Sequence, residues 1–139
     1  MMSEVQFKCT CGACAVKAVG DPVMQVYCHC DDCQAAAGGP YVARSIYPKG
    51  QVEVVSGETR SWTYKTNTRT FCARCGVTLF SEPPGDRFTG CNAALFPAGA
   101  FKPTAHIQCQ SAMVPVKDDL PHYRDWPPGV GGTGELVGW

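Results

Sequence analysis

Cysteine dominates the residues of this chain that could carry out chemistry. Ten of the 139 residues are cysteines, and eight of them lie in three short groups. C-x-C and C-x-x-C spacings bring two sulfurs onto one small ion, and Zn²⁺ takes four such ligands in a tetrahedron, about 2.3 Å from each sulfur. Together the groups indicate metal binding. They are Cys9-Thr10-Cys11-Gly12-Ala13-Cys14, Cys28-His29-Cys30-Asp31-Asp32-Cys33 and Cys72-Ala73-Arg74-Cys75-Gly76.

Clustered cysteines also have functions other than zinc binding. A disulfide framework would suit a short secreted chain, but the first eight residues lack the basic and apolar regions of an export signal, so we expect a cytoplasmic protein with reduced thiols. A redox C-x-x-C pair needs a βαβ setting, and no amphipathic helix follows any of the three groups. Iron–sulfur clusters are also held by thiolates and remain an alternative.

The composition excludes several classes of partner. Lys plus Arg and Asp plus Glu both number 12, and the sequence has no basic block, so we expect no nucleic-acid binding. The apolar stretches are too short to cross a bilayer, which predicts no membrane segment. With 45% hydrophobic and 17% charged residues the chain should fold. We predict one zinc-binding domain over residues 1–139, with an irregular Pro/Gly-rich tail at 118–139.

The 15 glycines and 11 prolines divide the sequence into short segments, as an all-β domain requires. Alternating hydrophobic and polar residues, as in Gln51-Val52-Glu53-Val54, mark strands between these turns. One helix is predicted at 31–37, because Asp31 and Asp32 suit a first turn and Gly38 follows the last residue. A further helical turn is predicted within 93–100. Strands are predicted at 15–19, 23–27, 41–47, 51–56, 60–65, 77–81 and 87–92.

The order of the cysteine motifs resembles that of the glutathione-dependent formaldehyde-activating enzyme family, which includes the centromere protein V-like proteins. The series runs C-x-C-G, C-H-C-x-x-C, R-x-F-C-x-x-C-G and P-x-x-H-I, and it covers most of the chain, from Lys8 to about Tyr123. The matching segments are Cys9-Thr10-Cys11-Gly12, Cys28-His29-Cys30-Asp31-Asp32-Cys33, Arg69-Thr70-Phe71-Cys72-Ala73-Arg74-Cys75-Gly76 and Pro103-Thr104-Ala105-His106-Ile107.

This resemblance implies a mainly β, single-domain β-tent of small antiparallel sheets, with zinc knuckles and one or two short helices. It also implies two zinc ions per chain, one structural and one catalytic. The structural ion would be held by Cys9, Cys11, Cys72 and Cys75, and the catalytic ion by Cys28, Cys30 and Cys33. Four protein thiolates close a zinc site, whereas three leave one position for a water or a substrate thiol.

The activity implied by the resemblance is that of a carbon–sulfur lyase. Glutathione, a small-molecule thiol, would condense with formaldehyde to S-(hydroxymethyl)glutathione. A thiol on the open zinc loses its proton, and its sulfur can then attack the carbonyl carbon. The alternative is a non-catalytic zinc-binding module that binds a protein or a metabolite. A fourth thiolate at the second zinc, from Cys91 or Cys109, would favour this module.

The other cysteines and the histidines are predicted to be structural. Small buried side chains are expected at Cys14, Cys91 and Cys109. The alternative for Cys14, which completes a C-x-C-x-x-C spacing, is to compete as a ligand of the first zinc. His29 should point away from its two cysteine neighbours in an extended segment. His106 should be a hydrogen-bonded structural residue, and His122 should lie on the surface.

Recognition of glutathione would also need cations. Its two carboxylates call for Arg, Lys or backbone N–H partners. Arg44, Lys65 and Arg69 are candidates by residue type. Nothing in the sequence predicts the oligomeric state.

Overall fold

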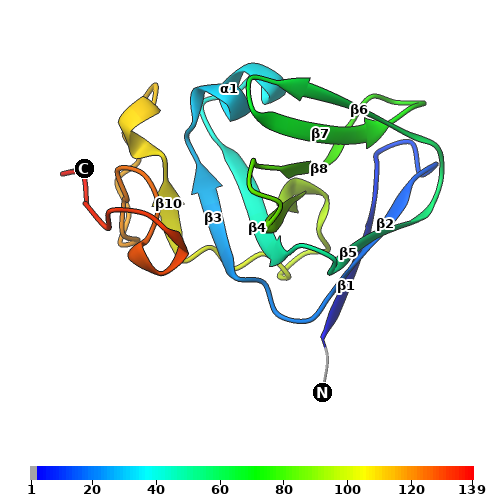
Figure 1. The fold of residues 1–139 in the computed structure, drawn as a ribbon, viewed down its shortest axis with the longest axis horizontal. Helices are drawn as coiled ribbons and strands as arrows, with labels where there is room; N and C mark the ends of the chain where they lie inside the picture. The colour runs from blue at the N-terminus through cyan, green and yellow to red at the C-terminus, as the bar shows by residue number, and fades with distance from the viewer. Residues whose placement is uncertain (1–2) are drawn as a thin grey trace.

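In the computed structural model, which describes residues 3–139, ten strands form two sheets (Figure 1). The smaller sheet has the order β1-β2-β5, and the larger has the order β10-β3-β4-β9-β8-β7-β6. All strand pairs are antiparallel except β10–β3, which is parallel. The strands are β1 (Glu4–Lys8), β2 (Ala15–Val19), β3 (Met24–Cys28), β4 (Val42–Pro48), β5 (Val52–Ser56), β6 (Thr59–Tyr64), β7 (Asn67–Cys72), β8 (Thr78–Glu82), β9 (Phe88–Asn92) and β10 (Ala105–Ile107).

The predicted mainly β fold with a short helix is confirmed. Each of the seven predicted strands overlaps an observed one, and the helix α1 (Asp31–Ala37) covers the predicted residues. The sequence pattern misses β1, β7 and β10. β7 lacks the hydrophobic alternation of a half-buried strand, because its buried positions include Arg69 and Thr70. Short 3₁₀ turns complete the fold: η1 (Ala93–Leu95), inside the turn predicted at 93–100, η2 (Cys109–Ser111) and η3 (Pro128–Val130).

Helix α1 is fixed at both ends by residues of the second cysteine group and by a glycine. The Cys30 side chain caps the first turn, since its sulfur accepts a hydrogen bond from the Cys33 N–H at 3.2 Å. Gly38 ends the helix in the left-handed conformation (φ 68°) and donates to the Gln34 carbonyl at 2.9 Å. The helix therefore begins at a cysteine that also belongs to the candidate site.

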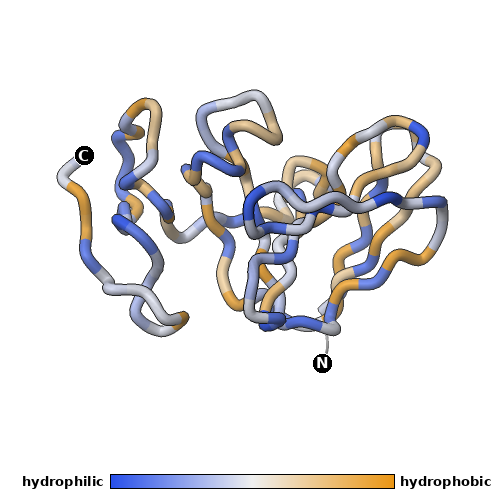
Figure 2. The backbone as a smooth tube through the Cα atoms, turned by 45° about the horizontal axis from the view of Figure 1, so that its top comes forward, coloured by the Kyte–Doolittle hydropathy of each residue, from blue (hydrophilic) through white to orange (hydrophobic). Residues whose placement is uncertain are grey.

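Two hydrophobic cores lie on opposite faces of β4, and each one is built around a cysteine group. Successive side chains of a strand point to opposite faces, so Tyr47 enters the first core and Ile46 the second. The first core comprises Phe7, Cys9, Cys14, Val16, Ala18, Tyr47, Cys72, Leu79 and Cys91. The second comprises Val26, Cys28, Cys33, Ile46, Ala105 and Ile107. Hydrophobic and hydrophilic residues alternate along the strands of the smaller sheet (Figure 2).

The segment after η2 runs along β10 and is tied to it by backbone hydrogen bonds. His106 N–H donates to the Pro121 carbonyl, and Tyr123 N–H donates to the His106 carbonyl, both at 2.9 Å. Gln108 N–H donates to the Asp125 carbonyl at 2.8 Å. The C-terminal residues thus form the flank of the molecule beside β10 (Figure 1). Within residues 3–139, no helix is long and apolar enough to cross a membrane.

Candidate functional site

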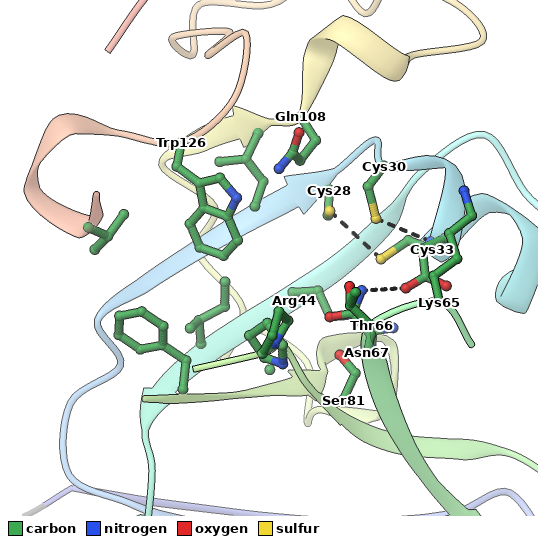
Figure 3. Close-up of a pocket in the computed structure, with 18 of the residues that line it drawn as sticks. Cys28, Cys30, Cys33, Arg44, Lys65, Thr66, Asn67, Ser81, Gln108 and Trp126 are labelled. Carbon is green, nitrogen blue, oxygen red and sulfur yellow. Dashed lines mark hydrogen bonds between the residues drawn. The ribbon is translucent and has the colours of Figure 1, made fainter. Parts of the chain in front are cut away.

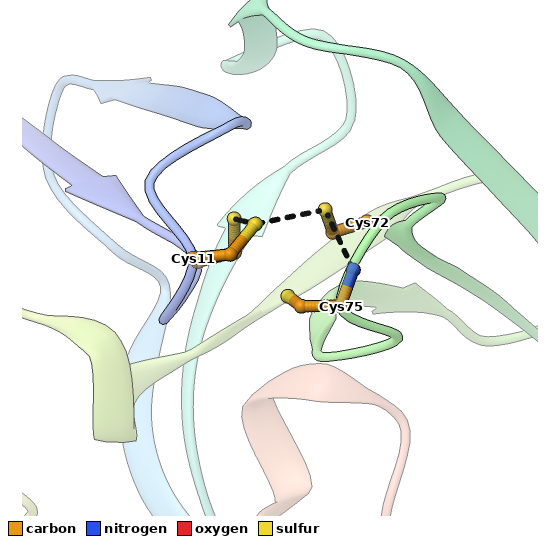
Figure 4. A group of neighbouring side chains, drawn as sticks. Cys11, Cys72 and Cys75 are labelled. Atoms are coloured by element: carbon orange, nitrogen blue, oxygen red, sulfur yellow. Dashed lines mark hydrogen bonds between the residues drawn. The ribbon is translucent and has the colours of Figure 1, made fainter.

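The first cysteine cluster joins two distant parts of the chain. Cys9 and Cys11 lie in the loop between β1 and β2, whereas Cys72 ends β7 and Cys75 lies in the turn after it (Figure 4). The four sulfurs lie within 4.8 Å of one another. Cys9 and Cys11 Sγ are 3.5 Å apart, and Cys11 and Cys72 Sγ are 3.7 Å apart. A zinc tetrahedron with 2.3 Å bonds has sulfurs about 3.8 Å apart, so this donor set fits the ion.

Backbone N–H groups surround these sulfurs and stabilise negative charge on them. Cys14 N–H donates to Cys9 Sγ at 3.3 Å, while the N–H groups of Arg74 and Cys75 donate to Cys72 Sγ at 3.3 and 3.4 Å. A hydrogen bond from the Val77 N–H is the largest cause that lowers the pKa of Cys75 to about 6. Thiolate is the form that binds metal, so the turn is preorganised for a cation.

The second cysteine cluster is local in sequence. Cys28 ends β3, Cys30 caps α1 and Cys33 lies in the first turn of that helix, and their sulfurs face one another (Figure 3). The three sulfurs lie within 4.8 Å, and those of Cys28 and Cys33 are 3.7 Å apart. In residues 3–139 no fourth Cys, His, Asp or Glu joins this group. Three thiols with one open position are the donor set of a zinc site that accepts an outside ligand.

A buried ion pair supports this second cluster from the side of β7. Arg69 Nη1 donates to Asp32 Oδ1 at 3.1 Å, and Nη2 contacts Cys33 Sγ at 3.8 Å. The side-chain amide of Asn67 donates to the other oxygen of Asp32. Hydrogen bonds from the Cys28 and Cys30 thiols, followed by the nearby guanidinium charges, hold the pKa of Cys33 far below its usual range. Of the three cysteines, only Cys33 has a lowered pKa, because the pKa values of Cys28 and Cys30 are raised.

The second cluster opens onto a cavity of about 520 Å³. All three cysteines line it, together with the three cationic candidates from the sequence, Arg44, Lys65 and Arg69. Gln108 and Trp126 form the opposite wall (Figure 3). Sequence reasoning did not identify Asn67, Ser81 or Trp126 as cavity residues, and no motif marks them. The volume suits a small molecule of the size of a peptide thiol.

The remaining cysteines lie outside both clusters. All ten cysteines fall within residues 3–139 and are free, so none forms a disulfide. The predicted burial of Cys14, Cys91 and Cys109 is confirmed, since their exposed fractions are 0%, 0% and 5%. The Cys14 thiol donates to the Glu58 carbonyl at 3.2 Å, which accounts for its place beside the first cluster.

The three histidines form one buried group, on the face of β3 and β10 opposite to the second cysteine cluster. His29 points away from the cysteine sulfurs, as expected, and its Nε2 lies 2.9 Å from His106 Nδ1. Nε2 of His106 lies 2.7 Å from a carboxylate oxygen of Asp118, so the predicted hydrogen bonding of His106 is confirmed, and His106, Asp118 and His122 together form a third group of possible metal ligands. The surface position predicted for His122 is wrong: the residue is 6% exposed. Pairing of the C-terminal segment with β10 buries it, and sequence patterns do not reveal that pairing.

Comparisons with known proteins agree with the arrangement of the cysteines. The sequence model of the glutathione-dependent formaldehyde-activating enzyme family matches residues 4–111. An uncharacterized lyase of Schizosaccharomyces pombe is 29% identical over 79 residues, which make up 57% of this chain and 58% of that protein. The chain thus matches less than two thirds of the length of this curated relative.

A solved structure has a similar fold. It is the crystal structure of a Rhodobacter sphaeroides protein, a structural genomics target, and it matches with a TM-score of 0.53 at 18% sequence identity. The match covers 68% of this chain and 89% of that one, and at this identity it supports the fold alone. The family match includes both cysteine clusters in full. The chain therefore belongs to the glutathione-dependent formaldehyde-activating enzyme family.

Proposed function

We propose that this protein is a zinc-dependent carbon–sulfur lyase that acts on adducts of glutathione or a related thiol with an aldehyde. The observation that carries the proposal is the second cysteine cluster, with three thiols and one open position on a cavity. Membership of the family supports a lyase, as does the name of the fission-yeast relative. The proposed reaction joins glutathione and formaldehyde to S-(hydroxymethyl)glutathione, or runs in reverse.

The two cysteine clusters would have different roles. Cys9, Cys11, Cys72 and Cys75 would hold a structural zinc, and Cys28, Cys30 and Cys33 would hold a catalytic one. When bound at the three cysteines, zinc would supply positive charge that favours the thiolate form of a substrate thiol. In the condensation, the sulfur forms a bond to the carbonyl carbon, the C=O π pair moves to oxygen, and the proton lost by the thiol ends on that oxygen.

The residues of the chain would position the thiol and shield it. Arg69 holds Asp32 and Cys33 in place, which fixes the direction in which the open position faces. Trp126 and Ile107 provide apolar walls that exclude water from the reacting sulfur. The cationic lining of the cavity attracts an anionic thiol such as glutathione.

Exchange NMR with glutathione and ¹³C-formaldehyde tests the proposal. The zinc-loaded protein should speed the exchange between free formaldehyde and the hydroxymethyl adduct in proportion to its concentration. Cys30→Ala should abolish this acceleration, because it removes one ligand of the open site. Cys109→Ala, the matched control, removes a thiol that lies outside both clusters and should retain it. No acceleration by the protein carrying two zinc ions would refute the lyase.

The non-catalytic module is the competing function. It would need a fourth protein thiolate at the second cluster, for which Cys91 and Cys109 were the candidates. Neither sulfur joins the cluster in the described chain. This arrangement favours the enzyme over the module.

A further inference from the structure

Arg44 is a buried cation without a partner. Its side chain lies within the larger sheet, and the residue is only 6% exposed. Within residues 3–139 its guanidinium makes no hydrogen bond and no ion pair, and its Nε is buried with no acceptor. Burying an unpaired charge costs free energy unless an anion binds it. The charge of Arg44 acts on the Cys33 thiol without a hydrogen bond to it, so its N–H donors are left for an anion in the cavity.

The strand register places Arg44 beside the second cysteine cluster. Cys28 on β3 is opposite Val42 on β4, and Arg44 is two residues further along β4, opposite Val26. Cys28 and Arg44 are thus diagonal neighbours on one face of the sheet, a relation that spans about 7–8 Å and that a long side chain can bridge. Both residues line the cavity, and the Arg44 side chain extends into it below the three sulfurs (Figure 3).

Two of the other cations that line the cavity are paired with carboxylates. Lys65 pairs with Asp31, and Arg69 pairs with Asp32. Arg69, not Arg44, is the arginine that contacts the sulfur of Cys33. The two carboxylates that line the cavity are therefore occupied. Arg44 is the buried cation left for a ligand, whereas Arg87, which also lines the cavity, is exposed and lies over the Phe88 ring at 4.9 Å from its centroid.

A glycine and a serine from the neighbouring strands lie beside Arg44. Gly90 on β9 lines the cavity, and a Cβ built on it would lie 3.6 Å from Arg44 Cδ and 3.6 Å from Ser81 Oγ. The hydroxyl of Ser81, which also lines the cavity, is a further donor near the same space.

We propose that Arg44 binds a carboxylate of the substrate thiol, so that the site selects thiols that carry a carboxylate over neutral thiols. This inference rests on the proposed function, which places the thiol at the open position of the second cluster. A guanidinium binds a carboxylate through two parallel N–H···O bonds. The sulfur and the carboxylate would then be held at two fixed points, which orients the thiol for attack.

Calorimetry with two matched thiols tests whether Arg44 binds a carboxylate of the thiol. 3-Mercaptopropionate carries the carboxylate, and 3-mercaptopropionamide is its neutral counterpart of nearly the same shape. The zinc-loaded protein should bind the acid at least about tenfold more tightly than the amide, as one charge-assisted hydrogen bond would give. Arg44→Gln should remove this preference and leave the affinity for the amide unchanged. Arg44→Lys keeps the charge but not the paired geometry, and it should retain part of the preference.

Arg60→Gln is the matched control. It removes the same charge from an exposed position on β6 outside the cavity, so the preference for the acid should persist. Equal binding of acid and amide by the unmutated protein would overturn the role of Arg44 and leave the thiol site intact. A preference for the acid that persists in Arg44→Gln would also overturn the role of Arg44. If neither thiol binds, both the inference and the proposed function are overturned.

Discussion

Arg69 and Asp32 form an ion pair at 3.1 Å in which the side chains are only 1% and 5% exposed. Arg69 comes from β7 and Asp32 from α1, so the pair joins the two elements on either side of the cavity. Arg69 also contacts Cys33 Sγ. A single buried pair thereby connects the integrity of the sheet to the geometry of the open cysteine site.

Asp32→Asn should destabilise the protein by about 3 kcal/mol or more, because it leaves the buried charge of Arg69 without its carboxylate. Asp31→Asn is the matched control at the preceding residue of α1. Its pair with Lys65 is exposed (64% and 49%), so the loss should stay below about 1 kcal/mol. Urea unfolding of the zinc-loaded variants measures both. Equal losses of unfolding free energy in the two variants would show that the buried pair stabilises the protein no more than the exposed pair.

Cys72→Ser and Cys30→Ser should damage the protein in different ways. The first cluster ties the β1–β2 loop to the end of β7, and a structural zinc contributes on the order of 10–16 kcal/mol of apparent binding free energy. Cys72→Ser should therefore unfold the domain or destabilise it strongly. Cys30→Ser affects a site that spans six residues and should leave the fold largely intact with one zinc lost.

Circular dichroism and zinc counts on the two variants check this division of labour. A folded Cys30→Ser protein with one zinc, beside an unfolded or barely stable Cys72→Ser protein, is the expected pair of results. Equal loss of structure in both would contradict the assignment of one structural and one catalytic ion.

The C-terminal segment should open as the pH falls. Backbone N–H groups, of Thr133 first and then of Trp126, hold the pKa of the Asp125 carboxyl below its usual value. A carboxylate with a lowered folded pKa contributes its stabilisation above the unfolded value of about 4 and loses it as pH drops through the folded value. Trp126 lines the cavity, so thiol binding should weaken in the same range.

Amide NMR from pH 6 to pH 3 follows this opening through the Thr133 signal. Asp125→Asn should show a shifted and more mobile Thr133 at every pH, because the charged acceptor is gone. Asp119→Asn removes an exposed carboxylate that makes no side-chain hydrogen bond in the described chain, and it should titrate like the unmutated protein. An Asp125→Asn protein that still opens with acid would assign the effect to another group.

Much of the candidate site was predictable because the cysteines of its second cluster are close in sequence. Cys28, Cys30 and Cys33 need only a strand end and one helical turn to meet, and the Asp31-Asp32 start and Gly38 end of that helix are local signals. The pairing of Cys9 and Cys11 with Cys72 and Cys75 came from the family resemblance, since spacing alone leaves the partner of a C-x-x-C pair open.

The missed features all depend on contacts between distant residues. β7 can bury Arg69 because Asp32, 37 positions earlier, pairs with it. A hydrophobic pattern along the strand cannot predict an ion pair with so distant a residue. β10 has three residues and gains its pairing from β3 and the C-terminal segment. The burial of His122 follows from the same pairing. Local pattern thus predicted which cysteines of the second cluster come together, while tertiary contacts decided which charged groups surround them.

A crystal structure of the zinc-loaded protein with glutathione, with anomalous data at the zinc edge, tests the central claim most directly. Two zinc peaks per chain are predicted. One should be bound by Cys9, Cys11, Cys72 and Cys75, and the other by Cys28, Cys30 and Cys33 with the glutathione sulfur as fourth ligand. A fourth ligand from the protein at the second ion, or glutathione bound away from it, would contradict the account.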